Sequence, residues 1–109
     1  MRIIANRSIT SCWKKYPDAK ASLAVWEERM YSAKCENHED LKRIFVNADY
    51  IPNPQFKHLT IFNINGNEYR LAADIFFNTG HVFIKWFGKH SNYDKTDFKN
   101  MKNSGFKLC

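Results

Sequence analysis

The spacing of apolar residues changes near the middle of the chain, so helices are predicted first and strands afterwards. Residues 2–5 are too few for a helix and predict a brief strand. Over residues 8–16 the apolar positions follow the i, i+3, i+4, i+7 pattern of a helix that Ser8 can cap. After Pro17 and Asp18, a second helix is predicted from one stripe of apolar side chains: Ala19, Leu23, Trp26, Met30 and Ala33.

A third, shorter helix is predicted over residues 39–45, with its apolar side chains Leu41, Ile44 and Phe45 turned inward. Residues 47–55 follow this helix and contain Pro52 and Pro54. We therefore expect that segment to be a loop.

From residue 58 onward the pattern becomes extended. Asn65 and Gly66 form a strong hairpin signal because both residues tolerate positive φ. A strand over residues 68–77 follows, and the three residues 78–80, ending in glycine, fit a second hairpin that returns as a strand over 81–87. The second half of the chain therefore predicts a three-stranded meander.

A last, polar helix is predicted over residues 91–101, with Ser91 as its N-cap and Asp94 three residues later. Together these elements predict an α+β fold: a small antiparallel sheet of three to four strands, the N-terminal one included, with helices packed on one face. The other face is expected to be available, with four residues on it or at its rim: Arg70, Lys85, Lys89 and His90.

Composition supports a folded chain with one core. Hydrophobic residues make up 44% and aromatic residues 16% of the 109 positions, which is too much for a chain that stays disordered through charge. A chain of this length has room for one hydrophobic core, so residues 1–109 are expected to form a single domain.

The formal net charge of +6 is concentrated in the C-terminal half. Residues 56–109 carry eight Lys and Arg against four Asp and Glu, whereas residues 1–55 carry nine against seven. This bias favours a polyanion such as RNA or DNA, or an acidic protein, as the partner. A basic surface that serves only solubility is the alternative.

The three cysteines, Cys12, Cys35 and Cys109, form no Cys-x-x-Cys pair and imply neither a disulfide framework nor a four-thiolate zinc site. The N-terminus lacks the apolar run of a signal peptide, and no stretch approaches the roughly 20 apolar residues of a membrane helix. We therefore expect a cytoplasmic protein without membrane partners.

The residues that suggest chemistry are Arg70, His90 and Tyr93, with phosphate contacts expected from Lys57, Lys85 and Lys89. Metal-independent RNA cleavage needs a base for the 2′-hydroxyl proton, a cation for the phosphorane and an acid for the leaving 5′-oxygen. Histidine can serve as acid or base, and arginine offers a bidentate fork to phosphate oxygens. Tyrosine can stack on a base or donate its hydroxyl. No metal and no cofactor is expected.

Each of these residues also has a plainer interpretation. Arg70 could be a solvated cross-strand partner, His90 a helix cap and Tyr93 a packing residue. The other histidines, His38, His58 and His81, are expected to be ordinary surface residues. Cys35 and His38 have a helix-compatible metal spacing, but no second ligand pair accompanies them.

Two segments, residues 62–71 and 83–94, together resemble the HigB-type mRNA interferase toxins of the RelE superfamily. The first holds an asparagine-glycine-asparagine turn followed by Tyr-Arg-Leu, and the second ends in Gly-x-His-x-x-Tyr-Asp. Residues 16–19 and 48–49 resemble the same family, so the similarity covers most of the chain. Lys89 stands where the family commonly has a threonine.

The resemblance implies a RelE-like microbial-ribonuclease fold and cleavage of mRNA, usually on the translating ribosome. It also implies neutralisation by a HigA-type helix-turn-helix antitoxin. By position, Arg70 matches the family's sheet arginine that contacts the scissile phosphate. His90 and Tyr93 match the polar and aromatic groups after the last strand. A non-catalytic module that only binds RNA or the antitoxin is the rival hypothesis.

Overall fold

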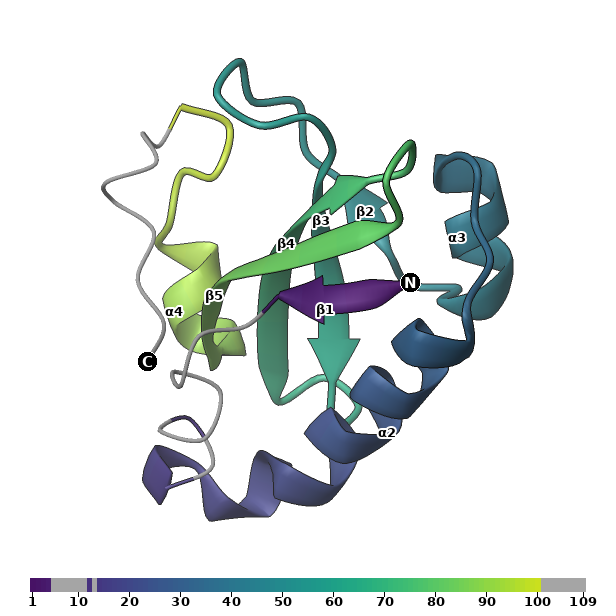
Figure 1. Ribbon diagram of the computed structural model, residues 1–109. Coiled ribbons are helices and arrows are strands. Elements are labelled where there is room, and N and C mark those ends of the chain that lie inside the picture. Colours follow the sequence, from purple (N-terminus) through teal and green to yellow (C-terminus); the bar gives the residue numbers. More distant parts are fainter. Residues whose placement is uncertain (5–11, 13, 101–109) are drawn as a thin grey trace.

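The computed structural model describes residues 1–4, 12 and 14–100 and confirms the α+β class (Figure 1). Its strands are β1 (Arg2–Ile4), β2 (Asp49–Tyr50), β3 (Leu59–Ile64), β4 (Tyr69–Phe76) and β5 (His81–Lys89). Its helices are the 3-10 helix η1 (Pro17–Ala19), α2 (Lys20–Ser32), α3 (His38–Ile44) and α4 (His90–Asp94). The helix expected over residues 8–16 lies mostly outside the described residues, although Cys12, Lys14 and Lys15 are helical.

The strands form one sheet in the order β1-β5-β4-β3-β2. The predicted meander of β3, β4 and β5 is confirmed as its centre, with both connections antiparallel. The sheet has five strands rather than three or four, and it is mixed because β1 pairs in parallel with β5. The segment expected to be a loop over residues 47–55 contains the two-residue strand β2, which pairs with Thr60 and Ile61.

The hairpin between β3 and β4 turns where the sequence predicted it. Asn65 and Gly66 have φ angles of 53° and 63°, the left-handed region that these two residue types tolerate best. The second hairpin likewise turns at Gly80, whose φ is 72°. These turns fix the register that brings Arg70 of β4 opposite Asn63 of β3 and Gly88 of β5.

The main core lies between the sheet and α2. The predicted stripe is confirmed, because every one of its side chains is at most 5% exposed: Ala19, Leu23, Trp26, Met30 and Ala33. Alternate residues of β4, Tyr69, Leu71, Ala73 and Ile75, meet this stripe from the sheet. α3 contributes Leu41, and its N-terminus is capped by Asn37, which accepts a hydrogen bond from the backbone N–H of Asp40.

The opposite face of the sheet is not wholly free, as had been expected. A smaller apolar cluster covers part of it, built from Leu59, Ile61, Ala72 and Phe98, with Trp86 and Tyr93 at its margin. The helix expected over residues 91–101 is shorter, because α4 runs only from His90 to Asp94. Its N-cap is Lys89 and not Ser91, as had been expected. The chain beyond α4 packs against the sheet through Phe98, whose carbonyl accepts a hydrogen bond from Asn53.

Two cysteines lie in the described part of the chain and both are buried. Cys35 is a free thiol whose pKa is raised by burial, followed by the nearby charge of Asp40. Cys12 takes part in a disulfide, which the spacing of the cysteines did not predict. Within residues 1–4, 12 and 14–100, no helix has both the length and the apolar character needed to cross a membrane.

Candidate active site

Arg70 is held rigidly on β4 and is 8% exposed. Its guanidinium donates to the side-chain oxygen of Asn67 at 2.6 Å and to the carbonyl of Tyr69 at 3.0 Å. The guanidinium carbon also lies 5.7 Å from the centre of the Tyr93 ring, a cation–π distance. Arg70 is therefore not the solvated cross-strand partner of the plainer interpretation.

Among the described residues, the ion pairs are Arg43 with Asp40 and His90 with Asp94, so no carboxylate neutralises Arg70. A buried guanidinium is costly unless an anion or hydrogen-bond acceptors compensate it. Asn67 and Tyr69 compensate it only in part, because both are neutral acceptors. This arrangement suits an anion supplied by a ligand, and a phosphate matches the guanidinium fork.

His90 is the first residue of α4 and follows β5 directly. Its backbone N–H donates to the carbonyl of Glu68, which ties α4 to the β3–β4 hairpin. The ring lies nearly parallel to that of Tyr93, with centres 6.3 Å apart, and Nε2 is 3.4 Å from the Asp94 carboxylate. The side chain is 40% exposed, so substrate can reach it. The cap position belongs to Lys89, so the helix-cap interpretation of His90 is wrong.

Tyr93 lies between His90 and the small apolar cluster. Its ring stacks on Phe98 with centres 5.2 Å apart, so it is a packing residue as well as a neighbour of Arg70. Burial raises its pKa above the ordinary value of 10.0, and the charge of Asp49 adds to the rise while Arg70 opposes it. The hydroxyl therefore stays protonated at neutral pH and can donate a proton or a hydrogen bond.

An open cavity of about 410 Å³ lies beside this group, and both Arg70 and Tyr93 line it. Asp49, at the start of β2, and Asn63, opposite Arg70 on β3, form other parts of its wall. His90 instead lines a separate cavity of about 270 Å³, together with Lys89 and Ser91. Substrate bound at Arg70 would thus have Tyr93 beside it and His90 behind Tyr93.

The three lysines lie in different places. Lys85 sits at a register irregularity in β5, where its ammonium is 5.7 Å from the rings of both Phe56 and Phe83. Lys89 pairs with Tyr69 and points to the other face of the sheet, with its ammonium 5.9 Å from the Tyr16 ring. Lys89 follows Gly88, the partner of Arg70, whereas Lys85 lies three residues before it.

Lys57 is not brought together with Arg70. It is an exposed loop residue whose backbone N–H meets the Asp74 carboxylate at 3.4 Å. Asp74 lies four residues beyond Arg70 on β4, which corresponds to about 13 Å along a strand.

Several residues of the site were given no role in it from the sequence. Asn67 orients Arg70, Asp94 meets His90, and Asp49 and Asn63 line the cavity. Asn67 and Asp94 stand three and four residues from their partners, so their spacing was a usable signal. Asp49 and Asn63 carried no such signal because they reach the cavity only through sheet pairing.

Across residues 1–4, 12 and 14–100, no three His, Cys, Asp or Glu side chains converge on a point where they could hold a metal ion. Cys35 and His38, whose spacing would fit a metal site on a helix, therefore have no third ligand among these residues. His38 instead packs its ring against Tyr50, with centres 5.6 Å apart.

The chain is similar to known toxins over most of its length. A family model described as the RelE-like toxic component of a toxin-antitoxin system, HigB toxin, matches residues 19–96. The mRNA interferase toxin HigB of Escherichia coli strain K12 is 29% identical over 97 residues, which cover 86% of this chain and 88% of that protein. The mRNA interferase HigB of Escherichia coli O6:H1 is 26% identical over 98 residues, covering 87% and 90%. The family match spans well over half of the chain and includes β2 to β5 with Arg70, His90 and Tyr93, so the chain belongs to the HigB toxin family.

Proposed function

We propose that this chain is the toxin of a toxin–antitoxin system and an endoribonuclease that cleaves mRNA. The relatives named mRNA interferases support RNA as the substrate. The observation that carries the proposal is Arg70: a buried guanidinium, fixed by Asn67, without a carboxylate partner in the described structure and beside Tyr93, whose ring stacks in turn on His90. A buried guanidinium that is fixed in this way suits the negative charge of a phosphodiester.

In the proposed reaction the 2′-hydroxyl attacks the adjacent phosphorus, and the bond to the 5′-oxygen breaks. The products are a 2′,3′-cyclic phosphate and a 5′-hydroxyl. Arg70 binds the phosphate and stabilises the charge of the phosphorane. His90 exchanges protons with the attacking or leaving oxygen, and Tyr93 stacks on a base or donates its hydroxyl proton. Lys57, Lys85 and Lys89 contact flanking phosphates.

We expect single-stranded RNA to be preferred, because a flexible backbone can reach in-line geometry and unstacked bases can lie on aromatic rings. Cleavage on the translating ribosome would explain why so few candidate catalytic groups suffice. The proposal also includes independence from metal ions, a cytoplasmic location and a HigA-type helix-turn-helix antitoxin as the partner. That antitoxin would complement the basic surface of the toxin.

The first test is inducible expression of the wild type beside Arg70→Ala and His90→Ala, following growth and mapping new mRNA 5′ ends. Arg43→Ala is the matched control, since it removes an exposed guanidinium from α3. We expect arrest and fresh 5′-hydroxyl ends with the wild type and Arg43→Ala, and neither with the two site variants. Folded wild-type protein that causes no arrest and no new ends would refute the nuclease.

A second test separates catalysis from mere binding. His90→Ala should abolish cleavage of purified RNA or ribosome-bound mRNA while leaving RNA binding within a few-fold of the wild type. Cleavage should persist in excess EDTA, provided that ribosomes are replaced by free RNA when magnesium is removed. Loss of activity in EDTA that returns with added Mg²⁺ would overturn metal independence, and equal RNA binding without turnover in the wild type would favour the binding-module hypothesis.

A further inference from the structure

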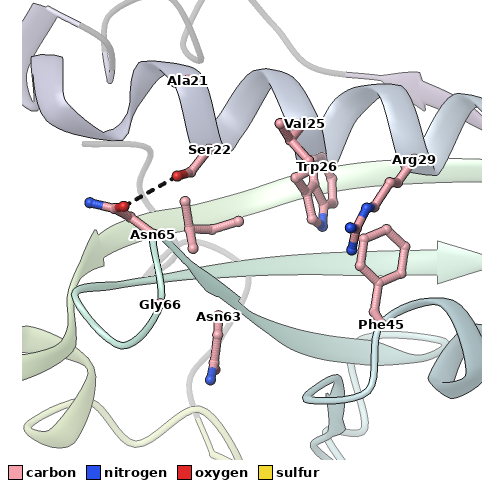
Figure 2. Close-up of a pocket in the computed structure, with 10 residues that line it drawn as sticks. Ala21, Ser22, Val25, Trp26, Arg29, Phe45, Asn63, Asn65 and Gly66 are labelled. Atoms are coloured by element: carbon pink, nitrogen blue, oxygen red, sulfur yellow. Dashed lines mark hydrogen bonds between the residues drawn. The ribbon is translucent and has the colours of Figure 1, made fainter.

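A second cavity lies on the other side of the sheet from Arg70, between α2 and the β3–β4 hairpin (Figure 2). Its volume is about 340 Å³. Val25, Trp26 and Arg29 of α2 form one wall, and the hairpin residues Asn63 and Asn65 form the other. The hydroxyl of Ser22 donates to the side-chain oxygen of Asn65 at 3.3 Å, which holds the two walls together at one end.

Two hydrogen-bond donors of α2, the buried Trp26 indole and the exposed Arg29 guanidinium, have no acceptor among the residues that the structure describes. The indole N–H of Trp26 is buried, has no hydrogen-bond partner within the described residues, and belongs to a side chain that is only 3% exposed. Figure 2 shows its nitrogen beside the guanidinium of Arg29. Arg29 belongs to neither of the ion pairs formed between described residues. A buried donor without an acceptor costs stability that a ligand can restore.

The chemistry of the cavity favours a carboxylate flanked by apolar groups. The described residues that line it include no Asp or Glu. Its apolar lining comes from Val25, Trp26, Phe45 and Ile64. Val25 is 51% exposed at the rim, and Val46, beside the adjoining cavity of about 220 Å³, is 74% exposed. Arg29 and Phe45 line both cavities, so the two form one continuous groove.

We propose that this groove binds an acidic, apolar segment of the antitoxin, with a carboxylate of that segment paired to Arg29. This inference rests on the proposed function, because it assumes that an antitoxin exists. A peptide fits better than RNA here, since exposed valines at the rim offer nothing to a phosphate backbone but pack well against apolar side chains.

The groove also predicts how the antitoxin lies relative to the catalytic residues. Trp26 and Ile64 belong to the main core face of the sheet, whereas Arg70 and Tyr93 face the smaller cluster. Asn63 lines all three cavities, and Val46, Asn47 and Ala48 line both the cavity of about 220 Å³ and the one beside Arg70, so the groove continues to the Arg70 cavity. A segment seated at Arg29 is thus anchored outside the active site, and its continuation along the groove past Asn63 can cover Arg70.

The test compares Arg29→Glu and Trp26→Phe with the wild type in two assays on the same purified proteins: RNA cleavage, and binding of the purified antitoxin that is encoded with this chain. Arg43→Glu is the control, because it makes the same charge change on an exposed residue outside the groove. We expect Arg29→Glu to weaken antitoxin binding by more than about tenfold, and Trp26→Phe by a few-fold. Cleavage by both variants, and both properties of Arg43→Glu, should match the wild type.

The outcomes separate the inference from the function beneath it. A wild type that cleaves no RNA contradicts the proposed function, whatever binds to the groove. If the wild type cleaves RNA but Arg29→Glu binds the antitoxin as tightly as Arg43→Glu does, the inference is overturned and the nuclease stands. Arg29→Glu protein that is folded yet loses RNA binding would assign the groove to RNA instead.

Discussion

Arg70 depends on neighbours that come from separate parts of the chain. The side-chain oxygen of Asn67, in the hairpin turn, accepts a hydrogen bond from the Arg70 guanidinium. The Tyr93 ring lies beside the guanidinium, and Gly88 pairs with Arg70 across β5. A Cβ on Gly88 would lie 2.8 Å from the Trp86 ring, so only glycine lets that indole lie across the strand next to Arg70. The position of one side chain is thus set by a turn, a helix and a glycine.

Asn67 is a positioning residue, and its removal should affect turnover more than binding. In Asn67→Ala the guanidinium loses its 2.6 Å acceptor but keeps its charge and the Tyr69 carbonyl. We expect kcat on a single-stranded RNA to fall by about tenfold, because misplaced catalytic groups lose rate steeply, while KM changes by less than threefold. A rise in KM with unchanged kcat would show that Asn67 contacts the substrate itself.

The hydroxyl of Tyr93 can be separated from its ring. Tyr93→Phe keeps the stack on Phe98 and the contact with Arg70. Because the raised pKa keeps the hydroxyl protonated, we expect it to act as a donor, and its loss should slow cleavage by about 100-fold with RNA affinity unchanged. Tyr93→Leu, which lacks the ring, should weaken RNA binding as well. Full activity in Tyr93→Phe would leave Tyr93 with a stacking role only.

At the scale of elements, one hydrogen bond joins η1 to β4. The Tyr69 hydroxyl donates to the Asp18 carboxylate at 2.6 Å. This bond raises the pKa of Tyr69 to about 12 and lowers the pKa of Asp18 below its ordinary value of 3.8. The bond therefore stabilises the fold over the range in which tyrosine is protonated and aspartate is ionised.

The stability that this bond contributes should depend on pH at both extremes. Since the pKa of Tyr69 is raised on folding, its contribution is complete below pH 10 and is lost as the pH rises toward 12. Since the pKa of Asp18 is lowered, its contribution is complete above pH 3.8 and is lost below that value. Urea denaturation should show wild type more stable than Tyr69→Phe at pH 7, with the difference shrinking at pH 11. A constant difference between pH 7 and 11 would contradict this assignment.

Elements with a strong local pattern were predictable from the sequence, and elements that exist through distant contacts were not. The α2 stripe and the Asn65–Gly66 turn follow from spacing and from φ preferences. β2 has only two residues and is a strand because it pairs with β3. The end of α4 at Asp94 was also missed, because Phe98 beyond it is held in the small apolar cluster, with its carbonyl bonded to Asn53.

The same division applies to the candidate site. Arg70, His90 and Tyr93 were identifiable from residue type and motif, and the fold brings them together. The sequence could not rank the lysines by distance, because their places depend on which side of the sheet each side chain takes. An irregularity in β5 sets the position of Lys85, and the pairing with Tyr69 sends Lys89 to the opposite face.

At the scale of the whole molecule, the three lysines proposed to contact phosphates lie at different places on the sheet and are not gathered at Arg70. On β5, Lys85 lies three residues before Gly88, the partner of Arg70, which corresponds to about 10 Å along the strand, and Lys89 points to the opposite face of the sheet. Lys57 lies about 13 Å from Arg70 along the sheet, near Asp74. We therefore expect a short RNA bound at Arg70 to reach Lys85 first, and a longer strand to be needed for Lys57 and for Lys89. Only a longer single strand can contact all of them.

The salt dependence of RNA binding can test this order of contacts, because each phosphate contact releases counterions. In a His90→Ala background that leaves RNA uncut, Lys85→Gln should reduce the slope of log K against log salt concentration by about 0.7 for short and long RNA alike. Lys57→Gln and Lys89→Gln should reduce it for long RNA only. Lys34→Gln, an exposed lysine beyond α2, is the control and should change neither slope. An equal effect of Lys57→Gln on short RNA would mean that the strand runs toward Asp74 from its first nucleotide, whereas no effect on either RNA would remove Lys57 from the binding surface.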